Sequence, residues 1–106
     1  MSIMRDPDNQ PRIFDALVIP PEALDQGGIE VLRAAIVDGG LHVSLRRAFD
    51  EPDAFGMMLA DIARHVARLY ANETALTQDQ VLDRVRSTFE AEMDNPTDPG
   101  TTSAIS

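Results

Sequence analysis

The stretch from Glu30 to Arg47 reads EVLRAAIVDGGLHVSLRR and decides the fold that this sequence predicts. Two apolar-patterned runs are joined by Asp38-Gly39-Gly40. An Asp-Gly pair between such runs is a strong short-range signal for a β-hairpin, because both central residues of a tight two-residue turn need a positive φ. We therefore predict a hairpin with strands at about 29–37 and 41–47.

The choice of turn residues sets which side chains face each other across the hairpin. A Gly39-Gly40 loop would keep the same faces but would set Leu32 against Arg47, so we prefer a loop at Asp38-Gly39. The preferred register pairs Ile36 with Leu41, Ala34 with Val43, Leu32 with Leu45, and Glu30 with Arg47.

The first half of this stretch also fits a helix, which is the competing interpretation. Ile29, Leu32 and Ile36 lie on helical spacing, and the intervening Ala, Leu, Arg and Glu residues favour helix. The sequence leaves strand and helix open for Ile29 to Val37.

Two helices are expected after the hairpin, at about 51–71 and 78–93, with the hairpin packed under both. Asp50 can cap the first helix, and Thr77-Gln78-Asp79-Gln80 offers a capping box for the second. The apolar stripe of the first helix is expected to cover the apolar face of the hairpin. The stripes are Phe55, Met58, Leu59, Ile62, Val66, Leu69 and Tyr70, and then Val81, Leu82, Val85, Phe89 and Met93.

The expected organisation is one α+β domain at 13–94 between two tails. Residues 1–12 are predicted to be a flexible arm, and residues 95–106 a disordered tail rich in Pro, Gly, Ser and Thr. Within the domain, Ile13 to Ile19 is short, β-leaning and closed by Pro20-Pro21, so an added edge strand at 13–19 is one interpretation.

The charge balance excludes some classes of partner. Eighteen acidic and nine basic residues give a formal net charge of −9 over 106 residues, which repels nucleic acid phosphates and anionic membranes. No apolar run reaches the roughly 20 residues that span a bilayer, and the N-terminus does not resemble a secretory signal. We expect a cytoplasmic protein that binds neither nucleic acid nor membrane.

Two missing residue types exclude several mechanisms. The chain has no Cys, and all nine of its basic residues are Arg. It therefore has no thiolate nucleophile, no Cys-bound zinc and no Schiff-base lysine. The imidazoles, His42 and His65, belong to different expected elements, so we predict no metal site and no cofactor.

At this point the residues resemble a known family. The run EVLRAAIVDGGLHVSLRR, followed by EPDAFGMMLADIARHVARLY, resembles a small proteobacterial domain family of unknown function. The resemblance covers about Phe14 to Glu92. It implies a short chain of this family and brings no catalytic or binding residues with it.

The second face of the predicted hairpin carries the candidate binding residues Arg33, His42, Ser44 and Arg46. Two guanidiniums, an imidazole and a hydroxyl on one rigid surface can hold a carboxylate or phosphate, because Arg presents a planar fork of donors. The competing interpretation is a solvated face whose Arg residues discourage edge pairing and meet the protein's own acids.

A weaker candidate lies on the first long helix. Asp61 and His65 are one turn apart, so the carboxylate can bind the imidazole and raise its pKa, as a general base requires. The alternative is an ordinary surface pair beside Arg64 and Arg68. Phe55, Met57 and Met58 are read mainly as core, with Met57 the one most expected to be exposed.

These features favour a non-enzymatic interaction module over an enzyme. A two-stranded sheet is marginal alone and leaves an unpaired edge, so we expect a homodimer or a protein partner. The alternative function is a small-molecule anion-binding protein, or a small enzyme, that uses the face of Arg33, His42, Ser44 and Arg46.

Overall fold

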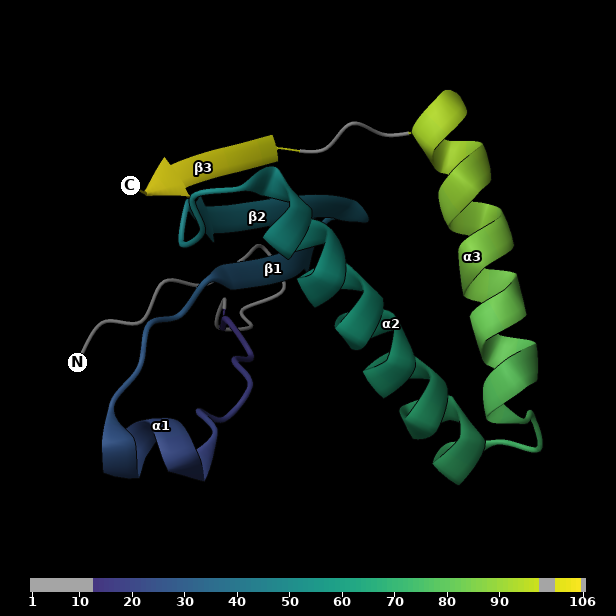
Figure 1. Ribbon diagram of the computed structural model, residues 1–106, viewed down its shortest axis with the longest axis horizontal. Coiled ribbons are helices and arrows are strands. Elements are labelled where there is room, and N and C mark those ends of the chain that lie inside the picture. The colour runs from purple at the N-terminus through teal and green to yellow at the C-terminus, as the bar shows by residue number, and fades with distance from the viewer. Residues whose placement is uncertain (1–12, 98–100, 106) are drawn as a thin grey trace, which may run out of the picture.

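A computed structural model describes residues 13–97 and 101–105 of the chain. The expected arm at 1–12 and parts of the expected tail lie outside these residues. Three helices and a three-stranded sheet make an α+β fold, as predicted (Figure 1). Over the described residues, no helix combines the length and apolar character needed to cross a membrane. The elements are α1 (Pro21–Gln26), β1 (Leu32–Val37), β2 (Gly40–Arg46), α2 (Pro52–Glu73), α3 (Gln78–Asp94) and β3 (Thr101–Ile105).

The hairpin forms as the turn chemistry predicts. Asp38 and Gly39 have φ values of 51° and 80°, the positive values that a type I′ turn requires. β1 and β2 are antiparallel, and the predicted pairs Leu32 with Leu45, Ala34 with Val43, and Ile36 with Leu41 are all present. The helical interpretation is therefore wrong over 32–37.

The open end of the hairpin differs from the prediction. The ladder begins at Leu32, so Glu30 does not pair with Arg47 across two strands. The Glu30 carboxylate instead accepts hydrogen bonds from Arg33, three residues along the chain. The backbone bond from Arg46 N to Val31 O closes this end of the hairpin, and Glu30 and Arg47 lie one residue beyond it.

The third strand comes from the part of the sequence that was expected to be a disordered tail. Thr101–Ile105 forms β3 and pairs in parallel with β2, which places β2 at the centre of the sheet. Ile13 to Ile19, the expected edge strand, is irregular and exposed. Local composition did not reveal β3, because strand formation depends on the edge available to pair with.

Two of the capping predictions made from the sequence can be compared with the hydrogen bonds at the helix ends. Thr77 Oγ1 accepts from Gln80 N at 3.1 Å and Gln80 Oε1 accepts from Thr77 N at 2.9 Å, so the predicted capping box is confirmed. At α2 the prediction of an Asp50 cap is wrong: Glu51 occupies the N-cap position and makes no side-chain cap bond. α1 ends at Gly27, whose φ of 79° suits glycine.

The helices leave most of the apolar surface uncovered. The first part of α2 crosses one face of the sheet, and the rest of the helix extends beyond it (Figure 1). α3 packs against α2 and lies beyond the sheet rather than over it. Among the described residues, only Ala67 of α2 and Val81 of α3 are buried. The described part of one chain therefore contains only a small buried core.

Two glycine substitutions should move stability in opposite directions. Gly39→Ala places a side chain at a φ of 80°, so we expect a loss of about 1 kcal/mol of unfolding free energy. Gly56→Ala adds a methyl group inside α2, where nothing lies within 4 Å, so we expect a gain of about 0.5 to 1 kcal/mol. Urea unfolding at one protein concentration measures both, and shifts of the same sign would contradict the turn assignment.

A second prediction concerns the end of α3. Thr97 donates its Oγ1–H and its backbone N–H to the Glu92 carboxylate at 2.6 and 2.7 Å, and these bonds lower the pKa of Glu92 from the usual 4.5. The stabilisation exists above the unfolded-state pKa and disappears as the pH falls through the lower folded-state pKa. Carboxyl NMR titration should show this low pKa, and Thr97→Ala should raise it part of the way back. An unchanged pKa in Thr97→Ala would contradict the assigned cause.

Candidate functional site

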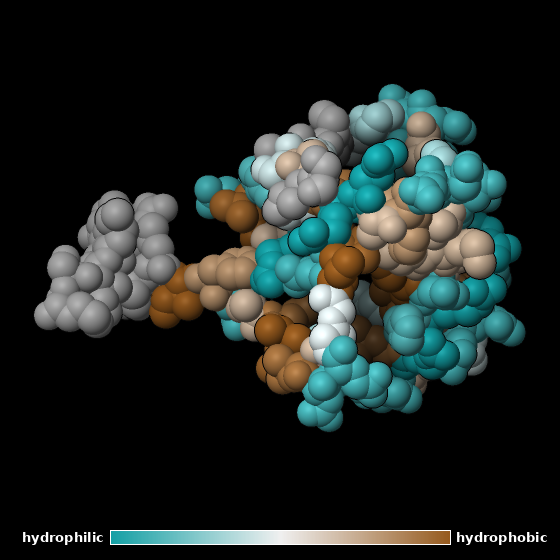
Figure 2. All heavy atoms as spheres, turned by 60° about the vertical axis from the view of Figure 1, so that its left-hand side comes forward, coloured by the Kyte–Doolittle hydropathy of each residue, from teal (hydrophilic) through white to brown (hydrophobic). Residues whose placement is uncertain are grey.

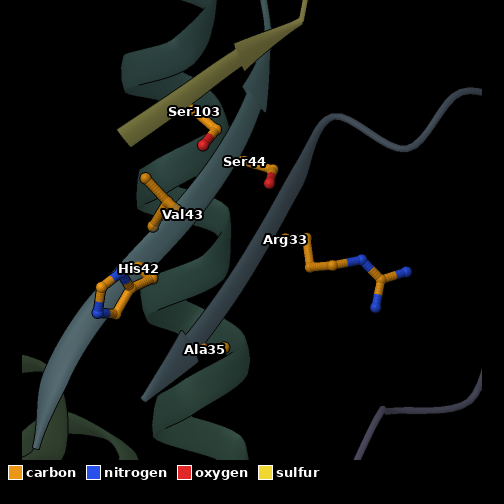
Figure 3. Close-up of a pocket in the computed structure, with 6 residues that line it drawn as sticks. All are labelled: Arg33, Ala35, His42, Val43, Ser44 and Ser103. Carbon is orange, nitrogen blue, oxygen red and sulfur yellow. The ribbon is translucent and has the colours of Figure 1, made fainter. Parts of the chain in front are cut away.

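The sheet face opposite α2 carries a shallow hollow of about 160 Å³. Strand alternation places Arg33, His42 and Ser44 on this face, as the sequence predicts, and the hollow adds Ser103 from β3 (Figure 3). Ser103 stands beside Ser44 in the parallel register. Its segment was expected to be disordered, so sequence reasoning missed it. The lining residues are Arg33, Ala35, His42, Val43, Ser44 and Ser103.

Arg33 is already engaged by an acid of its own chain. Its Nη2 lies 2.9 and 3.1 Å from the two Glu30 carboxylate oxygens, and its Nε lies 3.3 Å from one of them. The guanidinium carbon lies 6.0 Å from the ring centre of Phe14, within cation–π range. The fork that was expected to hold an anionic ligand therefore holds Glu30.

Arg46 does not join the hollow. Its Nε donates to the Glu30 backbone oxygen at 3.2 Å, at the open end of the hairpin. The four predicted residues thus separate into Arg33, His42 and Ser44 at the hollow and Arg46 beside it. Both guanidiniums are directed toward Glu30, but only Arg33 meets its carboxylate, whereas Arg46 meets its backbone oxygen.

The hollow is lined by polar groups, and its one guanidinium, that of Arg33, is already paired with Glu30. His42 is exposed, and the hydroxyls of Ser44 and Ser103 can donate or accept one hydrogen bond each to a small polar molecule. Within residues 13–97 and 101–105, no three His, Asp or Glu side chains gather where they could hold a metal ion. This chemistry suits weak polar contact more than the capture of an anion.

The expected Asp61–His65 pair does not form. Asp61 instead contacts Arg64 at 3.4 Å, and Arg68 Nη2 lies 3.1 Å from His65 Nδ1. Because a guanidinium only donates, Nδ1 is the acceptor in this contact. These contacts form an exposed polar surface network on α2, and neither of them joins Asp61 to His65.

Met57 is 71% exposed, as expected, whereas Phe55 and Met58 are half-buried. Phe55 meets Phe49 edge to face with ring centres 5.1 Å apart. This contact anchors the start of α2 to the end of the hairpin. Met57 belongs instead to the uncovered apolar surface.

The engagement of Arg33 by Glu30 predicts a weak response to anions. Millimolar inorganic phosphate should leave the melting temperature of the wild-type chain unchanged, because binding must first displace Glu30. Glu30→Gln, which frees the guanidinium, serves as the matched variant and should respond more strongly. A wild-type stabilisation that disappears in Arg33→Ala would instead establish an anion site on this face.

Comparisons with known proteins identify the family and a neighbour of the same fold. A solved structure from Rhodopseudomonas palustrus CGA009, described as a "putative pyruvate dehydrogenase", is 45% identical with a TM-score of 0.67, over 85% of this chain and 94% of that one. A comparison with curated proteins gave no significant match. The model of a domain of unknown function, DUF5076, matches residues 16–97. The chain therefore belongs to the DUF5076 family.

Proposed function

We propose that this protein is a self-associating module in which a second copy of the chain supplies the missing part of the core. The observation that carries the proposal is the burial pattern. Ala67 and Val81 are the buried apolar residues of the described chain, whereas seventeen large apolar side chains are exposed. A monomeric soluble protein rarely exposes large apolar patches to water.

The exposed apolar side chains form three groups, and the face shown in Figure 2 has brown apolar patches separated by hydrophilic side chains. The first group belongs to the segment before the hairpin, the second surrounds the hairpin turn, and the third lies on α2 and α3. They are Ile13, Phe14, Leu17, Val18, Ile19, Leu24 and Ile29; then Ile36, Val37 and Leu41; then Met57, Leu59, Ile62, Leu69, Tyr70, Phe89 and Met93.

The extent to which these side chains are exposed supports the proposal that a partner covers them. Leu17 and Val18 are 94% and 90% exposed, so their side chains gain almost nothing from folding of one chain. Burying one such aliphatic side chain contributes about 1.5 to 3 kcal/mol. A second copy offers the same surfaces by symmetry, which is how most soluble oligomers are built.

The net charge of −9 opposes this association, because two copies repel each other at long range. Association driven by apolar burial therefore strengthens when salt screens the repulsion. An interface held mainly by ion pairs would weaken under the same conditions. The response to salt thus separates the two kinds of interface.

Light scattering after size exclusion tests the proposal. We expect twice the 11.6 kDa mass of one chain at micromolar concentration, a melting temperature that rises with protein concentration, and tighter association in higher salt. Met57→Gln, on the apolar surface, should weaken the dimer, whereas Arg64→Gln, on the polar surface network of α2, is the matched control. A monomer that unfolds cooperatively at every concentration would contradict the proposal.

A further inference from the structure

Among residues 13–97 and 101–105, no strand pairs with the outer edge of β1, and hydrogen bonding within the hairpin fixes which backbone groups of β1 point to that edge. The strand order β1-β2-β3 places β1 at the edge of the sheet. Arg46 N donates to Val31 O at 3.0 Å. The backbone N–H and C=O groups of the odd-numbered residues in β1 therefore point to β2. Those of Leu32, Ala34 and Ile36 point outward, and no backbone bond from the rest of the described chain reaches them.

We propose that β1 of a second copy pairs antiparallel with this edge, around a two-fold axis at Ala34. This inference rests on the proposed self-association and names the surface that carries it. The pairing joins Leu32 to the partner's Ile36, Ala34 to the partner's Ala34, and Ile36 to the partner's Leu32. It would turn two three-stranded sheets into one sheet of six strands.

The backbone restricts the register. Outward groups at Leu32, Ala34 and Ile36 can bond only to the same outward groups of the partner. With the axis at Ala34 all three residues exchange both bonds, whereas an axis at Arg33 or Ala35 leaves one of the three without a partner in the edge strand. The Ala34 register therefore satisfies the most outward groups.

Charge favours the same register. With the axis at Arg33, two guanidiniums would lie directly opposite each other, which destabilises a strand pair. With the axis at Ala34, Arg33 faces the partner's Ala35, and its charge is already balanced by Glu30 at 2.9 Å. β1 lacks the Pro, bulge or unpaired charge with which proteins commonly protect an edge.

The pairing also brings apolar surface together. Ile36 is 70% exposed on the face of the sheet that α2 crosses, and it would meet the half-buried Leu32 of the partner on that same face. The segment containing Leu17 and Val18 lies on the side of β1 away from β2 (Figure 1). Phe14, near the start of this segment, approaches Arg33. A second copy at this edge would therefore approach the most exposed apolar side chains of the chain.

Amide hydrogen exchange on the wild-type chain tests the pairing without a substitution. In the dimer, the amides of Leu32, Ala34 and Ile36 should exchange slowly, and dilution below the dissociation constant should remove their protection. The amides of Arg33 and Ala35, which bond to β2, are the internal controls and should depend less on concentration. A dimer in which the three outward amides exchange as fast as in the monomer overturns the pairing and leaves self-association standing.

Opposite charges at Ala35 test the register. Ala35→Arg faces the partner's Arg33 and should raise the dimer dissociation constant on the order of tenfold, whereas Ala35→Glu at the same position should not raise it. Sedimentation at about 0.15 M salt limits the effect of the net charge, which acts in the opposite direction. Weakening by both variants would place the axis at Ala35, and no change in either would remove β1 from the interface. A wild-type monomer would overturn the pairing together with the proposed function.

Discussion

The two-residue turn at Asp38-Gly39 is the constraint on which the rest of the structure depends. Positive φ at both residues sets the register of β1 and β2, and the register assigns every side chain of the hairpin to a face. Aliphatic residues then lie toward α2 while Arg33, His42 and Ser44 lie away from it. A shift of the β1–β2 register by one residue would move the side chains of one strand to the opposite faces of the sheet. The aliphatic face toward α2 and the hollow beside Arg33 would both be lost.

The arrangement of the helices and the sheet leaves few apolar side chains buried within the described residues. α2 crosses one face of a small sheet and the second long helix packs on α2, so few side chains of the described residues are enclosed. Aliphatic residues supply most of the apolar surface, because only 5% of the chain is aromatic. The exposed apolar side chains are the surfaces that the proposed self-association would cover.

Two of the nine arginines of this acidic chain bond to the same residue, Glu30. Glu30 accepts from Arg33 with its carboxylate and from Arg46 with its backbone oxygen, so one residue gathers two guanidiniums at the open end of the hairpin. These bonds close the hairpin end opposite the turn. They also reduce the charge available for an outside anion and leave β1 without an unpaired charge along its edge.

The sequence by itself determined the features that depend on neighbouring residues: the turn, the strand register, the capping box at Thr77 and the shared face of Arg33, His42 and Ser44. Such features follow from backbone conformations and hydrogen bonds within a few residues. Tertiary structure decided which of several competing partners each remaining group takes. It paired Thr101–Ile105 with β2, left Ile13 to Ile19 unpaired and gave Asp61 to Arg64, because the energies of these choices depend on edges and neighbours that assemble only in the fold.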